Sequence, residues 1–158
     1  MKKNVDKWEI VSRFFVIVQF IVLFISLHFT TEQIKNSQNS TYMEYVLKFD
    51  TEFSEKKNHR IALAIEDNRP VLKANGGSFD EDDLGSYLDI YERLNEALQR
   101  NLIDKELIYN EFQDDLIATF KDQEIKNYIV KIRKIDPEYF DGFESLAKLF
   151  QNYHPTRK

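Results

Sequence analysis

Residues 14–31, FFVIVQFIVLFISLHFTT, decide how this chain is built, because they contain no Asp, Glu, Lys or Arg. Thirteen of the first 16 are Phe, Val, Ile or Leu. An α-helix of this length is about 27 Å long, close to the thickness of a hydrocarbon core. Its apolar side chains favour insertion by on the order of 4 to 8 kcal/mol. The stretch therefore predicts a transmembrane helix over residues 14–31.

Two other interpretations of this stretch are weaker. A cleaved signal peptide needs a shorter apolar core and small residues at the cleavage site, and the run SLHFT over residues 26–30 offers no such site. A helix buried on all sides of a soluble domain needs more surrounding protein than a chain of 158 residues supplies.

Charge is distributed unevenly on the two sides of this stretch. Residues 1–35 carry five basic and three acidic side chains, whereas residues 36–158 carry 17 and 24. The basic residues before residue 14 favour a cytoplasmic N-terminus, with the rest of the chain outside a bacterial inner membrane. The acidic remainder argues against nucleic acid as a partner.

The remainder of the chain has the apolar spacing of helices throughout. We expect a short basic tail over residues 1–13 before the span. After the span we expect a polar stalk or helix continuation over 32–41, a helical domain over 42–153 and a tail over 154–158. The fold class is all-α, a bundle of about five helices after one membrane helix. The inward faces are predicted at Tyr42, Tyr45, Val46, Phe49 and Phe53; Ile61, Ala62 and Ile65; Leu84, Tyr87, Leu88, Tyr91, Leu94 and Leu98; Ile108, Phe112, Leu116 and Phe120; Ile125, Tyr128, Ile129, Ile132 and Ile135; and Phe143, Leu146, Ala147 and Phe150.

Capping patterns predict where three of these helices begin. Ser78 with Glu81, and Asp141 with Glu144, have the spacing of capping boxes. Asp104 is a third predicted cap, with apolar residues in the two positions of a hydrophobic staple.

Three segments of the predicted domain resemble a known family. They are SYLDIYE over residues 86–92, NLIDKELI over 101–108 and YFDGFESLA over 139–147. These segments resemble the bacterial domain-of-unknown-function 4760 family, whose pattern covers most of the chain. The resemblance implies a helical domain, often behind one N-terminal membrane helix, and implies no activity, substrate or catalytic residue.

Three polar residues are candidates for function. Glu92 and Glu144 lie within the family pattern. The alternative to a functional role is, for Glu92, a solvated or internally paired carboxylate. For Glu144 it is a carboxylate that satisfies a helix N-terminus. Gln19 lies inside the predicted span, where an amide either bonds to another helix or reaches water.

Motifs for catalysis or cofactor binding are not found. The acidic run over residues 80–83 lacks the ligand spacing of an EF-hand and fits the first turn of a helix. There is no cysteine, no phosphate-binding loop and no His-Glu-x-x-His motif. We predict no catalytic, cofactor-binding or metal-ligating residue.

These observations favour a non-enzymatic, membrane-anchored interaction, sensor or scaffold module that binds another protein or itself. The alternatives are a metal-dependent hydrolase using carboxylates such as Asp80, Asp82 or Glu92, and an accessory subunit of a channel or transporter, with Gln19 and His28 facing a partner helix.

Overall fold

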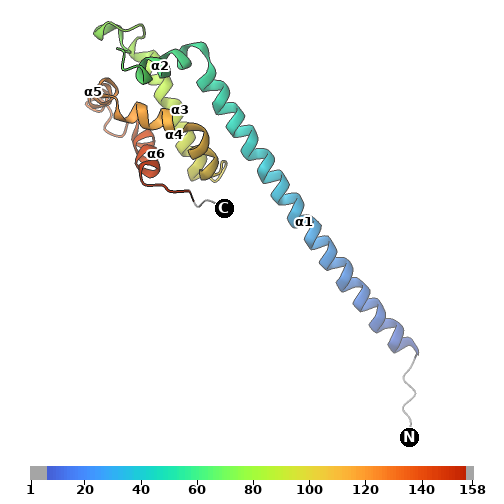
Figure 1. Cartoon of the computed structure of the whole chain (residues 1–158). Helices are drawn as coiled ribbons and strands as arrows, with labels where there is room; N and C mark the ends of the chain where they lie inside the picture. Colours follow the sequence, from blue (N-terminus) through green and yellow to red (C-terminus); the bar gives the residue numbers. More distant parts are fainter. Residues whose placement is uncertain (1–6, 156–158) are drawn as a thin grey trace. The chain divides into compact units, whose positions relative to one another are not determined.

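The structure is a computed structural model that describes the backbone of residues 7–155 and the side chains of residues 19–35, 37 and 40–155. Within this part the chain is all-α, apart from one short 3-10 turn and one isolated bridge. The helices are α1 (Lys7–Ser54), α2 (Lys56–Glu66), α3 (Glu81–Gln99), α4 (Lys105–Lys121), α5 (Gln123–Ile132) and α6 (Asp141–Gln151) (Figure 1). The prediction of an all-α fold is confirmed.

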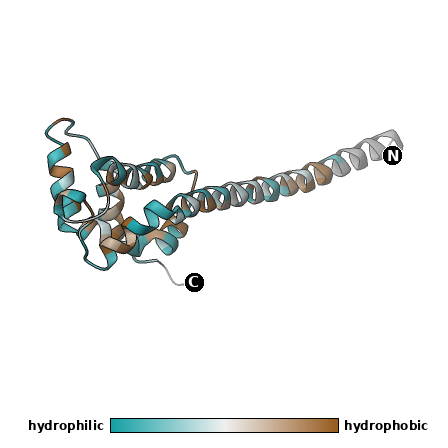
Figure 2. Ribbon diagram, turned by 90° about the horizontal axis from the view of Figure 1, so that it is seen from above, coloured by the Kyte–Doolittle hydropathy of each residue, from teal (hydrophilic) through white to brown (hydrophobic). Residues whose placement is uncertain are grey.

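The chain divides into two compact units, residues 1–40 and 41–158. In the first unit, the described side chains of α1 are exposed, and they include Phe20, Ile21, Val22, Leu23, Phe24 and Ile25. Much of this described stretch is coloured brown in Figure 2. No described helix contains a stretch that is both long and apolar enough to cross a membrane. The first five residues of the predicted span, 14–18, lie outside the residues whose side chains are described.

The second unit begins with the last turns of α1. The predicted face is confirmed here, because Val46 and Phe49 are buried and Phe53 packs partly buried against the core. α2 follows almost at once, with Ile61 and Ile65 buried as predicted.

The segment between α2 and α3 corrects the predicted start of α3. The backbone N–H groups of Ser78 and Phe79 both donate to the carbonyl oxygen of Val71, at 3.1 and 3.0 Å. This pairing keeps Ser78 and Phe79 out of the helix, so the predicted Ser78–Glu81 capping box is wrong. Asp80 is the N-cap instead: its carboxylate accepts from Asp83 N–H at 2.9 Å, and the Asp83 carboxylate accepts from Asp80 N–H at 3.3 Å.

α3 supplies the centre of the core and packs against α6. Five of its six predicted inward residues are buried, and Leu98 is partly buried. An aromatic ring of α3, that of Tyr91, contacts one ring from α1 and one from α6. The Tyr91 ring lies 4.8 Å from that of Phe53 and 5.5 Å from that of Phe143, measured between centroids.

The predicted N-cap of α4 is confirmed. The Asp104 carboxylate accepts from Glu106 N–H at 2.7 Å and Leu107 N–H at 3.4 Å. Both staple residues, Ile103 and Ile108, are buried.

The end of α5 and the start of α6 differ from the prediction. Ile135 was expected on the inward face of α5, but α5 ends at Ile132 and the Ile135 side chain is 85 % exposed. Phe140, in the left-handed conformation with φ 64°, precedes α6. Asp141 is therefore already inside the helix and cannot cap it, so the second predicted capping box is also wrong.

Candidate functional site

Glu92 binds the first turn of α6. Its Oε1 atom accepts a 2.6 Å hydrogen bond from the backbone N–H of Phe143. A β-carbon added to Gly142 would lie 2.5 Å from Glu92 Oε2, so glycine leaves room for the carboxylate. Glu92 is thus hydrogen-bonded within the domain, where a carboxylate on α3 supplies the acceptor that α6 lacks at its own N-terminus.

Glu144 belongs to an ion-pair network on the same turn. Its carboxylate oxygens lie 3.0 Å from Arg133 Nη1 and 3.0 Å from Lys148 Nζ. Arg133 also pairs with Asp141 at 2.7 Å and donates from Nε to the carbonyl oxygen of Tyr139 at 2.9 Å. Arg133 therefore fixes both α6 and the segment that enters it.

Two hollows lie beside this junction and share Asp89, Asp136 and Tyr139. They have volumes of about 400 and 230 Å³. We call the two together the Tyr139 groove. Its lining comes from α3, from the end of α5 and from the segment before α6, and consists of Asp82, Gly85, Ser86, Asp89, Glu92, Tyr128, Ile132, Ile135, Asp136, Glu138, Tyr139 and Phe140.

The charge of the groove is of one sign. Five carboxylates line it, whereas no Lys or Arg among the described residues does. Burial raises the pKa of Asp89, although the charge of Arg93 offsets part of this shift. Burial also raises the pKa of Glu92, with repulsion from Asp89 adding to the effect and the Phe143 hydrogen bond opposing it. Loss of water and like charge therefore both disfavour further negative charge here.

Tyr128 joins the groove to the N-terminus of α3. Its ring is buried, and its hydroxyl donates to the carbonyl oxygen of Glu81 at 3.1 Å. Burial, followed by the charge of Glu81, raises the pKa of Tyr128 to about 12. The hydroxyl is therefore neutral at pH 7 and holds α5 against α3.

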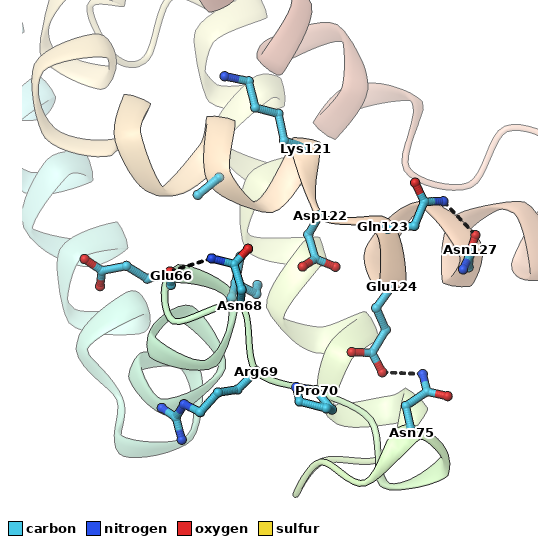
Figure 3. Close-up of a pocket in the computed structure, with 12 residues that line it drawn as sticks. Glu66, Asn68, Arg69, Pro70, Asn75, Lys121, Asp122, Gln123, Glu124 and Asn127 are labelled. Carbon is cyan, nitrogen blue, oxygen red and sulfur yellow. Dashed lines mark hydrogen bonds between the residues drawn. The ribbon is translucent and has the colours of Figure 1, made fainter.

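A separate, larger hollow of about 840 Å³ lies between the loop after α2 and the junction of α4 with α5 (Figure 3). Its polar groups mostly bind one another. The Glu124 carboxylate accepts from Val71 N–H at 2.7 Å, from Leu72 N–H at 3.0 Å and from Asn75 Nδ2 at 2.5 Å. We assign this hollow a structural role, because Glu124 fastens the loop to α5.

The acidic run 80–83 takes the predicted place in the first turn of α3. Three of its members have basic partners: Asp80 pairs with Lys73 at 3.5 Å, Asp83 with Lys57 at 3.0 Å, and Glu81 with Lys131. Within the described part of the chain, no group of three or more His, Asp or Glu side chains is placed to hold a metal ion.

Sequence reasoning selected Glu92 and, for the hydrolase alternative, Asp82, but it missed the other carboxylates of the groove and Tyr139. Asp89 lies three residues before Glu92, a spacing that brings two helical residues to the same face and was available as a signal. Tyr139 is part of the family pattern. Arg133 and Glu124 gave no local signal, because each acts on residues brought close only by folding. The third candidate, Gln19, has an exposed side chain on α1, far along the chain from these residues.

Comparison with known proteins gives a family and no characterised relative. No curated protein and no solved structure matches the chain. A family with the description "Domain of unknown function" (DUF4760) matches residues 13–150. The segments that carry the resemblance meet in the folded domain, where Tyr91 and Glu92 of one contact Phe143 of another. The chain therefore belongs to the DUF4760 family of domains of unknown function.

Proposed function

We propose that this chain is a single-span membrane protein whose helical domain binds another protein. The observation that carries the proposal is the run of exposed apolar side chains on α1. Six consecutive residues, 20–25, are each at least 50 % exposed. Successive helical residues are turned by about 100°, so these six point to all sides of the helix. A groove on a protein covers one side of a helix, whereas a lipid bilayer covers every side.

The proposed span is residues 14–31, with the N-terminus in the cytoplasm and the helical domain outside. Lys2, Lys3, Lys7 and Arg13 precede the span, and the twenty residues after it contain only two basic side chains. This asymmetry supports the orientation through the positive-inside rule. The hydrolase and channel-subunit alternatives stay predictions.

Membrane extraction tests the anchor. We expect the full chain to sediment with membranes, to resist alkaline carbonate and to dissolve in detergent. In the variant Val22→Asp/Phe24→Asp, two charges at the centre of the span cost about 5 to 7 kcal/mol, roughly the whole gain from insertion. That variant should be released by carbonate. The matched control, Leu47→Asp, changes an exposed apolar residue of the same helix beyond the span and should stay in the membrane.

Release of the unmodified chain by carbonate would overturn the anchor. The orientation has a separate test, a reporter fused after Lys158 that is active only in the cytoplasm. Activity of that reporter would reverse the proposed topology and leave the anchor unaffected.

The binding role of the helical domain is tested by crosslinking in native membranes. We expect the full chain to form a defined heteromeric adduct, at a mass above its own 18.9 kDa. Recovery of the chain only as a monomer or as multiples of its own mass would contradict binding to another protein.

A further inference from the structure

We propose that the Tyr139 groove binds a basic segment of a partner protein, one that presents Lys or Arg beside apolar side chains. This inference rests on the proposed function and names the chemistry of the partner.

The floor of the groove is apolar and open. Ile132, Ile135 and Tyr139 line it with the ring of Tyr128. The Ile135 side chain is 85 % exposed and that of Tyr139 is 43 % exposed. The segment that carries them is held in place, because Arg133 bonds to the Tyr139 carbonyl oxygen and the Tyr139 and Phe140 rings are in edge contact, 4.8 Å apart. Apolar side chains fixed in an exposed position gain from being covered by a partner.

The rim of the groove specifies the charge of that partner. None of the five groove carboxylates makes an ion pair among the described residues, whereas four acids close to them in the sequence do: Glu81, Asp83, Asp141 and Glu144. Arg93, whose charge acts on Asp89, is itself paired with Glu52 outside the groove. Lys or Arg side chains placed against these carboxylates supply the missing positive charge, and their aliphatic stems can cover the apolar floor.

The chain's own basic segment is excluded as the occupant by the proposed topology. Residues 1–13 lie on the opposite side of the bilayer from the groove in that topology. The partner is therefore a different protein, on the side of the helical domain.

The test uses the full chain in nanodiscs of phosphatidylcholine, which carries no net charge. The probe is a fluorescent 14-residue helical peptide of Lys, Leu and Ala, and its control is the same peptide with Glu in place of Lys. Anisotropy above that of empty nanodiscs reports binding. We expect the Lys peptide to bind, with affinity falling as NaCl is raised from about 0.05 to 0.3 M, and the Glu peptide not to bind.

Two variants separate the rim from the floor. Asp89→Asn/Glu138→Gln removes two charges and no hydrogen bond of the described structure, and we expect an affinity about fivefold lower or weaker still. Ile135→Ser removes an exposed apolar group, and we expect an affinity about threefold lower. The matched controls are Glu106→Gln/Glu111→Gln, two exposed acids elsewhere, and Val130→Ser, an apolar residue 63 % exposed outside the groove. Both controls should bind as the unmodified chain does.

Equal affinity of the groove variants and their controls would overturn the inference. Displacement of the peptide by spermine at an equal concentration would also overturn it, because the groove would then select small polycations. Either result leaves the carbonate test of the anchor untouched, so failure of this inference and failure of the proposed function are distinguishable.

Discussion

Glu92 Oε1 and the backbone nitrogen of Phe143 are 2.6 Å apart, although the two residues are separated by 51 positions in the sequence. A carboxylate on α3 thus does for α6 what an N-cap side chain does for its own helix. All eight tyrosines lie between residues 42 and 153, so near-ultraviolet circular dichroism of the full chain in detergent reports the unfolding of this domain.

Replacing Glu92 tests the capping role. Glu92→Gln keeps an oxygen acceptor and removes the negative charge. Burial raises the pKa of the Glu92 carboxyl group, which means that the folded domain disfavours this charge. We therefore expect the free energy of unfolding to change by less than about 0.5 kcal/mol. Glu92→Ala leaves the Phe143 N–H without its acceptor and should cost about 1 to 2 kcal/mol. The control Glu96→Ala removes an exposed pair with Arg100 and should cost little. Equal losses for Glu92→Ala and Glu96→Ala would contradict the role.

The Glu144 network gives stability a pH dependence of known sign. Burial alone would raise the pKa of Glu144, but the Lys148 hydrogen bond and the charge of Arg133 outweigh it and hold this pKa below its ordinary value. The contribution of the carboxylate is therefore present at neutral pH and is lost as pH falls through the folded-state pKa. Glu144→Gln should destabilise the domain at pH 7 and have a smaller effect at pH 3. A destabilisation that is the same at both pH values would show that charge is not the cause.

Two adjacent glycines predict different responses to alanine. A β-carbon at Gly77 would lie 2.2 Å from the carbonyl oxygen of Val71, and backbone atoms cannot give way locally. Gly77→Ala should therefore destabilise the domain by about 2 kcal/mol or more. Gly76 has open space but a φ of 92°, so Gly76→Ala should cost only about 1 kcal/mol. Thermal unfolding of the two variants measures the order, and a reversed order would refute this geometry of the loop.

Two isoleucines that the sequence analysis assigned to one inward face should differ in how much their replacement by alanine destabilises the domain. Ile129 is 4 % exposed, so Ile129→Ala should cost about 2 to 4 kcal/mol in a urea titration. Ile135 is 85 % exposed, so Ile135→Ala should change the unfolding free energy by less than about 0.5 kcal/mol. A loss of more than about 1.5 kcal/mol at Ile135 would mean that α5 continues beyond Ile132 and buries it.

Gln19 provides a test of association within the membrane. If its amide bonds to the same helix of a second copy, Gln19→Leu should lower the fraction of crosslinked oligomer in membranes, because a polar pair in lipid contributes about 0.6 to 2 kcal/mol. Gln33→Leu, an exposed position on the same helix after the proposed span, is the control. An oligomer fraction unchanged by Gln19→Leu would end this hypothesis.

Local sequence was enough to predict the helices and much of the core. Apolar residues three and four apart determine which face of a helix is buried, and this information lies within each segment. Asp104 was predicted as a cap because the donors that it satisfies are two and three residues away. The exposed apolar run on α1 was likewise readable from composition alone.

Tertiary structure decided the features that depend on residues distant in the chain. The hydrogen bonds from Ser78 N–H and Phe79 N–H to the Val71 carbonyl oxygen keep both residues outside α3, so the helix is capped by Asp80 and not by Ser78. The end of α5 at Ile132 exposed Ile135, and Arg133 fixed the segment that forms the Tyr139 groove. Helical periodicity is a property of neighbouring residues, whereas a groove is a property of surfaces that only folding brings together.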